Sequence, residues 1–414
     1  MGKRRVDLLV IGSRETVTVE GDESKDIGVV EDGGVAVKDG RIVQAAASQL
    51  LERKFVAKTV IDANGNVILP GFVDPHTHLV FNGTREDEFQ LSLGGASYMD
   101  ILKAGGGILE TVRRTRLSSE SELASIGLKR LDGFVESGST TVEIKSGYGL
   151  RTLEELKILR TMRELSTAHP CRVVPTFLGA HAVPTGQSLA EYSSDVVREM
   201  LPLVVKERLA AFCDVFCEEG AFDAKQSATI LRAAVRLGLK AKIHADEFSS
   251  TGGARVAAAT KCTSADHLIH SPLADLENML KAGVSPVILP ASSHSLLSKE
   301  HARAREMLSM GFPVALGTDF SPANWVVGQL TVAALAAREL RMRAWETIRG
   351  ITINAARALG MQGMVGSMAP GKMADLVMLN VPNHKWIGYG YGEGVVDKVL
   401  IGGKLVVENG KRLH

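Results

Sequence analysis

The sequence has few cysteines, and none of them stands in a pattern that chelates a metal or forms a redox pair. The chain of 414 residues contains four, at positions 171, 213, 217 and 262. Their spacing fits neither a zinc finger nor a Cys-x-x-Cys motif. In a chain of this length we therefore expect reduced, mostly buried thiols and a cytoplasmic protein rather than a disulfide framework.

The sequence also lacks an excess of charge and a long apolar run. The formal net charge is +1, so no global field attracts nucleic acid or an anionic membrane. No uncharged stretch is long enough to cross a bilayer. Basic residues precede the first apolar run, but Asp7 interrupts it and no cleavage pattern follows, so we expect a first strand there rather than a signal peptide.

A large buried core and more than one domain are expected, since 45% of the residues are hydrophobic and 23% are charged. Both ends of the sequence consist of short β-rich runs separated by turns, such as Asp39-Gly40 and Gly402-Gly403. We expect residues 1–66 and 364–414 to fold together as one composite β-sandwich domain.

Between them, residues 67–363 alternate between strand and helix. Eight strands are predicted, at Val67–Val73, Thr140–Ile144, Arg172–Leu178, Ala211–Phe216, Lys240–His244, Thr263–His267, Ser285–Leu289 and Pro313–Gly317. Predicted helices include Thr152–Glu164, Ser194–Val205, Lys225–Leu237, Pro272–Ala282 and His301–Met310. Eight such units predict an α/β fold, a closed (β/α)₈ TIM-like barrel with its active site at the carboxyl ends of the strands.

Those strand ends carry an unusual set of side chains. The first leads into His76-Thr77-His78, and strand alternation points both imidazoles to the same side. Later strands end in the following residues: Lys145, His181, Cys217-Glu218, His244 with Glu247, His267, and Asp319. Any one of these histidines alone is more often a hydrogen-bonded core residue. Together, three imidazoles and one carboxylate suit zinc or iron, with zinc favoured, and a position left for water would make the site catalytic.

Several longer segments carry a resemblance to known proteins. They are Pro-Gly-Phe-Val-Asp-Pro-His-Thr-His at 70–78, His-Leu-Val-Phe-Asn-Gly-Thr-Arg at 78–85, Gly-Ala-Ser-Tyr-Met at 95–99, Ala-Gly-Gly-Gly-Ile at 104–108, Glu-Ile-Lys-Ser-Gly-Tyr-Gly-Leu at 143–150, Thr-Phe-Leu-Gly-Ala-His-Ala-Val-Pro at 176–184 and Asp-Val-Phe-Cys-Glu at 214–218. Across essentially its whole length the chain resembles the amidohydrolase superfamily. Within it, the chain is similar to the imidazolonepropionases, the third enzymes of histidine degradation.

The resemblance implies a role for each matching residue. His76, His78, His244 and Asp319 would hold one metal ion. Arg85 and Tyr148 would bind the propionate carboxylate of the substrate, and His181, Glu247 and Ser321 would face its ring. Glu247, His267 and Asp319 would be the catalytic residues. The implied reaction is hydrolysis of the ring amide of 4-imidazolone-5-propanoate to N-formimino-L-glutamate.

Three further residues and one loop need separate interpretation. Lys145 could be taken for a carbamylated lysine bridging two metals, but that lysine belongs to the fourth strand and Lys145 ends the second. Glu218 is the candidate for a second-ion ligand. The glycines at 105–107 lack the Lys-Ser/Thr pair of a phosphate-binding loop. Ser321 stands where imidazolonepropionases usually have asparagine.

Two alternative functions stay open. The first is a deaminase or cyclic-amide hydrolase of the same superfamily that acts on another small heterocycle, and Arg85 and Tyr148 count against a substrate without a carboxylate. The second is a metal-free scaffold, which the presence of all four ligand positions disfavours. The expected partners are a small anionic heterocyclic substrate and a second copy of the chain in a homodimer, with no nucleic acid and no membrane.

Overall fold

The computed structural model describes residues 3–21, 26–95 and 106–413. Its largest feature is an eight-stranded parallel sheet whose strands follow one another in chain order. The strands are β8 (Phe72–Asp74), β9 (Ser139–Lys145), β10 (Arg172–Ala180), β11 (Phe212–Cys217), β12 (Lys240–Ala245), β13 (Ser264–His267), β14 (Ser285–Ile288) and β15 (Ala315–Leu316). Just beyond β8 and β15, a parallel bridge joins Thr77 to Phe320. The first and last strands therefore meet, and the predicted barrel is confirmed.

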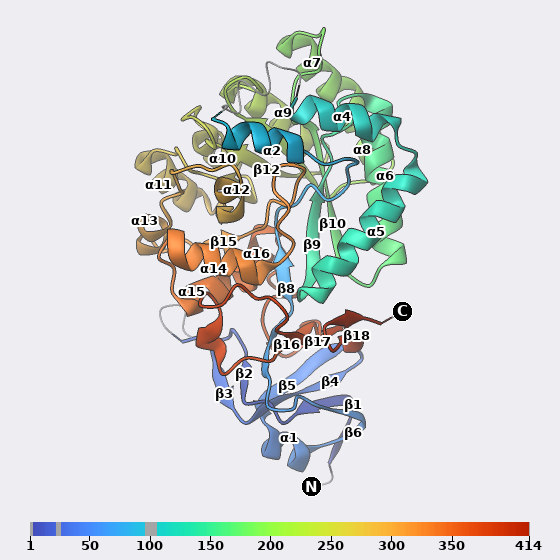
Figure 1. The fold of residues 1–414 in the computed structure, drawn as a ribbon, viewed down its shortest axis with the longest axis vertical. Coiled ribbons are helices and arrows are strands. Elements are labelled where there is room, and N and C mark those ends of the chain that lie inside the picture. The colour runs from blue at the N-terminus through green and yellow to red at the C-terminus, as the bar shows by residue number, and fades with distance from the viewer. Residues whose placement is uncertain (1–2, 22–25, 96–105, 414) are drawn as a thin grey trace.

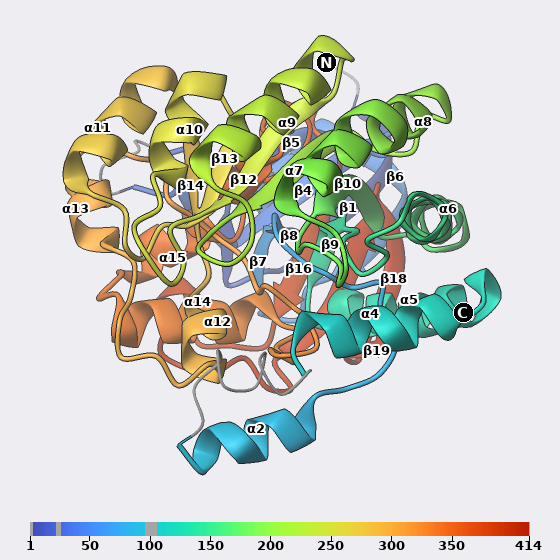
Figure 2. The same cartoon turned by 90° about the horizontal axis from the view of Figure 1, so that it is seen from above.

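Helices surround these strands, as Figures 1 and 2 show. They are α4 (Ile108–Leu117), α5 (Glu120–Glu136), α6 (Thr152–Ala168), α7 (Leu189–Asp195), the π-helix η1 (Val196–Met200), α8 (Leu201–Lys206), α9 (Ala224–Arg236), α10 (Gly253–Thr260), α11 (Leu273–Ala282), α12 (Pro290–Ser295), α13 (Ala304–Ser309), α14 (Gln329–Glu339), α15 (Ala344–Gly350) and α16 (Ile353–Ala358). Helix α2 (Glu86–Leu93) stands outside this ring. No helix of the described part of the chain is long and apolar enough to span a membrane.

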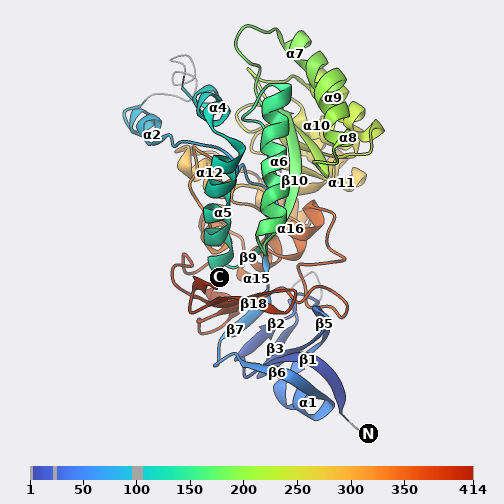
Figure 3. The same ribbon diagram turned by 90° about the vertical axis from the view of Figure 1, so that its right-hand side faces the viewer.

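Two further sheets lie at one end of the barrel (Figure 3). The smaller has the order β5 (Arg41–Ala47), β4 (Gly33–Lys38), β1 (Arg4–Ile11), β6 (Phe55–Asp62), and is flanked by α1 (Ser48–Lys54). The larger has the order β19 (Lys411–Arg412), β18 (Lys404–Glu408), β17 (Val396–Ile401), β16 (Leu376–Leu379), β7 (Val67–Pro70), β2 (Glu15–Val17), β3 (Val29–Glu31), and the short 3-10 helix η2 (His384–Trp386) precedes β17.

One buried cluster joins these two sheets and both regions of the sequence. It contains Leu8 and Val35 from the smaller sheet and Ile68, Leu376 and Leu400 from the larger one. Because β16 from the C-terminal region pairs directly with β7, the two β-rich ends form one β structure, as expected. The exact division into residues 1–66 plus 364–414 and 67–363 stays a prediction.

The predicted strand Val67–Val73 is wrong in one respect, because it is two strands. Residues 67–70 form β7 in the larger extra sheet, and residues 72–74 form β8 in the barrel. Gly71 lies between them, and its backbone N–H donates to Asp375 O over 2.8 Å. A Cβ on Gly71 would lie 2.3 Å from Thr140 Oγ1, so only glycine fits where the chain passes from one sheet to the other.

Several element boundaries also differ from the prediction. The stretch predicted as one helix at Ser194–Val205 begins in α7 and continues through the π-helix η1 into α8. Helix α13 begins at Ala304 instead of His301, and β15 contains only Ala315 and Leu316. The four cysteines are free and buried, as expected. Because β8 comes directly from the larger extra sheet, the amino ends of the barrel strands face the two sheets. Their carboxyl ends, with the predicted site, lie at the far end.

The cluster between the two sheets generates a stability prediction. Val10 on β1 is fully buried, whereas Val60 on the neighbouring β6 is 55% exposed. Val10→Ala should lower the free energy of unfolding by about 1.5–3 kcal/mol, because it removes buried methyl groups. The same change at Val60 should stay within about 0.5 kcal/mol. Urea denaturation followed by circular dichroism checks both, and equal effects would show that the inter-sheet cluster contributes little.

Candidate active site

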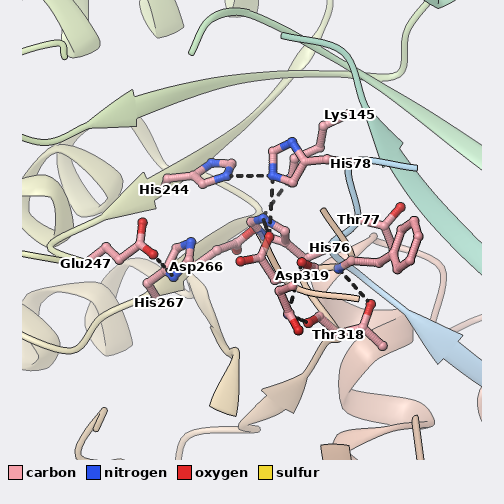
Figure 4. A network of polar contacts seen from close by, with 12 residues as sticks. His76, Thr77, His78, Lys145, His244, Glu247, Asp266, His267, Thr318 and Asp319 are labelled. Atoms are coloured by element: carbon pink, nitrogen blue, oxygen red, sulfur yellow. Dashed lines mark hydrogen bonds and ion pairs between the residues drawn. The ribbon is translucent and has the colours of Figure 1, made fainter. Parts of the chain in front are cut away.

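Three histidines meet at the carboxyl ends of the barrel strands (Figure 4). His76 and His78 follow β8, and His244 lies on β12. All three are buried, and one ligand atom of each lies within 4.8 Å of the others. His78 Nε2 is 3.4 Å from His244 Nε2. Among the described residues this is the group of histidine, cysteine and acidic side chains that could hold a metal ion.

Asp319 supplies a carboxylate to the same point. Its Oδ1 lies 3.4 Å from His76 Nε2 and 3.5 Å from His78 Nε2. The residue follows the last barrel strand and has a positive φ of 53°, an uncommon conformation for a residue with a side chain. Asn324 supports this backbone, since its Nδ2 donates to Thr318 O over 2.7 Å and to Asp319 O over 3.2 Å.

Asp74 connects the first and last barrel strands beneath the ligands. Its carboxylate accepts hydrogen bonds from Thr318 Oγ1 over 2.7 Å, from Thr318 N over 3.2 Å and from His76 N over 3.3 Å. Burial raises the pKa of this carboxyl group to about 7, although these hydrogen bonds act in the opposite direction. Asp74 thereby fixes the backbone of two of the ligand-bearing segments relative to each other.

The orientation of the histidines fits a metal site. Asp266 Oδ2 lies 2.6 Å from His76 Nδ1, and Asp214 Oδ2 lies 3.1 Å from His244 Nδ1. A carboxylate at Nδ1 keeps the proton there and leaves the Nε2 lone pair free for a metal. His76 Nε2 is buried and has no hydrogen-bond partner. Burial and nearby positive charge lower the pKa of His76 and His78 well below the usual value, so both imidazoles are neutral, as metal ligands must be.

Two acids and a further histidine complete the reactive part of the site. His267 lies at the end of β13, and its Nδ1 is 3.4 Å from Glu247 Oε1. Burial, with the charges of Asp319 and Glu218, raises the pKa of Glu247 well above the usual value. Burial also raises the pKa of Asp319 to about 6. Burial lowers the pKa of His267 well below the usual value.

A cavity adjoins the histidines and contains the residues that were expected to bind substrate. Its lining includes Arg85, Tyr148, His181, Glu247 and Ser321. Arg85 is 9% exposed, and its Nε is buried without a hydrogen-bond partner. Its Nη1 lies 3.6 Å from Glu88 Oε2. His181 stacks on His78 with ring centroids 5.0 Å apart, and its Nδ1 lies 3.1 Å from Gly147 O. The sequence-predicted site residues therefore all come together.

Lys145 and Glu218, the two residues considered for a second metal ion, form hydrogen bonds within the protein instead. Lys145 Nζ donates to Glu143 Oε1 over 2.8 Å and to Asp214 Oδ2 over 2.7 Å. Burial alone would lower its pKa, but these carboxylates raise the pKa above the usual value. Lys145 therefore stays charged, and a charged amine does not react to form a carbamate. Glu218 accepts hydrogen bonds from the backbone N–H groups of Glu219 and Phe248, each over 2.9 Å. It shapes the loop that carries Glu247. Residues 96–105, which include 96–99 of one motif quoted above and 104–105 of another, lie outside the described residues.

Comparisons with known proteins agree with this geometry. The amidohydrolase family model matches residues 67–406. The chain is 46% identical to the imidazolonepropionase of Symbiobacterium thermophilum, with 99% of each chain covered. It is 43% identical to that of Geobacillus kaustophilus, with 98% of this chain and 99% of the relative covered. The chain belongs to the imidazolonepropionase family.

The fold of this imidazolonepropionase family member is similar to that of two solved deaminases. An adenosine deaminase from Xanthomonas campestris with bound zinc superposes with a TM-score of 0.77 at 20% identity, with 100% of this chain and 95% of that chain covered. The guanine deaminase of E. coli gives 0.73 at 17% identity, with 97% and 98% covered. At such low identity these likenesses show the amidohydrolase fold alone.

The sequence prediction missed the polar residues beneath the ligands. Glu143, Asp214, Lys242 and Asp266 are fully buried on the barrel strands. The sequence did contain a signal for these residues. Glu143 and Lys145 are two positions apart on one predicted strand, and Lys242 and His244 are two apart on another. Side chains two positions apart on a strand point to the same face, so each pair shares the inner face of the barrel. Ser292 was also missed. It lies on α12 and lines the cavity. Its hydroxyl lowers the pKa of Asp319, whereas burial raises it.

The cluster predicts that His244 is required for metal binding. His244→Ala removes one of the donors that face the common point, so the zinc content of purified protein should fall from about one ion per chain towards zero. His169 is a buried histidine whose Nε2 lies 3.2 Å from Asp132 Oδ1, before β10 at the opposite end of the barrel. His169→Ala is the matched control and should retain its metal in elemental analysis. Full metal content in His244→Ala would contradict the assignment.

Proposed function

We propose that this imidazolonepropionase family member hydrolyses the ring amide of 4-imidazolone-5-propanoate to N-formimino-L-glutamate, the third step of histidine degradation. The observation that carries the proposal is the placement of Arg85 in the same cavity as the metal-ligand cluster, with its buried Nε unpaired. A guanidinium group there would bind a carboxylate tail. The chain is a hydrolase of the amidohydrolase type, and the substrate is a small heterocycle.

The metal is proposed to be a single ion held by His76, His78, His244 and Asp319, with zinc favoured over iron. Imidazole and carboxylate donors suit both. Once bound, such an ion would supply a water-derived nucleophile near neutral pH and would polarise the substrate carbonyl. Glu218 is already held by backbone N–H groups, which supports one ion rather than two.

The chain's own acids and bases would handle the protons. Asp319, at the point where the ligands converge, would accept the proton of the attacking water. His267 would orient that water and stabilise charge on the carbonyl oxygen. Burial raises the pKa of Glu247 well above the usual value, which favours its protonated form, and Glu247 would donate this proton to the leaving ring nitrogen. His181, which lines the same cavity and stacks on His78, would hold the ring in place.

A direct assay tests the reaction. Purified, zinc-loaded protein should remove the ultraviolet absorbance of imidazolonepropanoate and release one N-formimino-glutamate per molecule consumed. His244→Ala should be inactive under the same conditions. Metal-loaded protein that leaves the absorbance unchanged at every substrate concentration would overturn the proposal. A cytoplasmic homodimer remains our prediction for the assembly, and light scattering of the purified protein checks the dimer.

Arg85→Ala should weaken substrate binding without loss of metal. The substitution removes a charge-assisted contact worth about 1.5–3 kcal/mol, so KM should rise tenfold to hundredfold. Zinc content should stay unchanged, because Arg85 is not among the ligands. Arg113→Ala is the matched control, since Arg113 pairs with Glu110 on the surface and is 61% exposed. An unchanged KM for Arg85→Ala would show that the substrate carboxylate is bound elsewhere.

Ser321 offers a test of substrate choice. It lines the cavity and is 8% exposed, and its hydroxyl is shorter than an asparagine amide and offers a single donor. If a water bridges it to the ring, Ser321→Asn should preserve or improve kcat/KM for imidazolonepropanoate, because the amide restores a direct contact. A wild type that is poor with this substrate and better with a bulkier cyclic amide would favour the alternative hydrolase.

A further inference from the structure

The interior of the barrel beneath the metal ligands contains an unusual concentration of charge. Two ammonium groups and three carboxylates lie there, and all five side chains are fully buried: Glu143, Lys145, Asp214, Lys242 and Asp266. Moving such groups out of water is costly unless they are paired closely. None of them belongs to the proposed ligand set or touches the substrate cavity, so their role must lie in what they do to neighbouring groups.

Lys145 occupies the centre of this group. Its Nζ lies 2.8 Å from Glu143 Oε1, 2.7 Å from Asp214 Oδ2 and 3.6 Å from Asp266 Oδ2. An ammonium group has three donors, and three carboxylates lie within 4 Å of this one. Lys242 is placed differently. It donates to Pro75 O over 2.9 Å and hydrogen-bonds to no carboxylate of the described residues. Its carboxylate neighbours are Asp266 Oδ2 at 3.6 Å, the distance that Lys145 also has to this oxygen, and Glu143 Oε1 at 3.8 Å.

The oxygens that face Lys145 also face two metal ligands. Asp214 Oδ2 lies 3.1 Å from His244 Nδ1, and Asp266 Oδ2 lies 2.6 Å from His76 Nδ1. Each of these two carboxylates faces a different histidine. Lys145 donates a hydrogen bond to Asp214, whereas Asp266 lies 3.6 Å from both Lys145 and Lys242. The strands that carry the carboxylates, β11 and β13, are not neighbours, because β12 lies between them.

We propose that Lys145 is a positioning residue of the metal site, which fixes His244 through Asp214. The carboxylates of Glu143 and Asp214 repel each other in a dry interior, and the ammonium group between them removes that repulsion. Without it, the Asp214 carboxylate would turn away from Glu143 and from the His244 imidazole. The Nε2 atoms would then no longer converge. This inference rests on the proposed metal-dependent function but is independent of the substrate.

Lys145→Met tests the proposal, because methionine has a similar length and no charge. Zinc affinity is measured by competition with a chromophoric chelator, without substrate, and should fall about 10- to 100-fold, the usual cost of removing a partner of a metal-bound histidine. The visible spectrum of the cobalt-substituted protein should change, since the ligand geometry changes. Lys242→Met is the matched control, with the same substitution at a lysine that is equally buried, and should lose clearly less affinity.

A double substitution separates positioning from a general effect on folding. If Lys145 acts through Asp214, the losses of zinc affinity in Lys145→Met and Asp214→Asn should not add in the double variant. Circular dichroism of the metal-free proteins monitors the fold. If Lys145→Met does not fold, Lys145→Gln decides by the same measurement: weakened zinc affinity supports the proposal, and wild-type affinity overturns it.

Two results would overturn the proposal directly. One is a folded Lys145→Met protein with wild-type zinc affinity and cobalt spectrum. The other is an equal loss in Lys145→Met and Lys242→Met, which would reflect the buried charge in general. Because no substrate is used, failure of the proposed hydrolysis leaves these results unchanged, and the two ideas can fail separately.

Discussion

The contact between the first and last barrel strands is the constraint on which the candidate site depends. His76 and His78 follow β8, and Asp319 follows β15, so the carboxylate reaches the imidazoles only where the barrel closes. Asp74 holds that junction through Thr318 and the backbone of His76. A small opening of the junction would separate the donors by more than a metal–ligand bond tolerates. The helices and the buried core serve the site chiefly by keeping this contact closed.

Strained backbone conformations occur at the carboxyl ends of the strands, next to the functional side chains. His267 has a φ of 72° and Asp319 a φ of 53°, while Asp246, which precedes Glu247, has a φ of 52°. Each such conformation costs on the order of 1–3 kcal/mol and persists only where surrounding contacts support it. Asp246 shows how, because its carboxylate accepts hydrogen bonds from the N–H groups of Gly253 and Ala254 over 2.9 and 3.1 Å. The loop after β12 thereby turns Glu247 towards the cavity.

The barrel and the site residues could be predicted from the sequence because the relevant signals are local. Chelating residues one position apart, and polar residues at strand ends, are visible in short windows, and a parallel barrel brings strand ends together. The division of residues 67–73 into two strands was not predictable in this way, since both halves are buried and apolar. The pairing of Lys145 with Asp214 was also hidden. It joins residues 69 positions apart, and only the fold shows which charged groups meet.

The strand order of the larger extra sheet has a consequence for synthesis of the chain. β7 pairs on one side with β2 and on the other with β16, which follows about 300 residues later. Ribosomes add about 5–20 residues per second, so β7 would wait about 15–60 s for its second partner. During that interval an apolar strand edge stays open to other chains. The nascent protein should therefore depend on chaperones until β16 has emerged, even if the barrel has already formed.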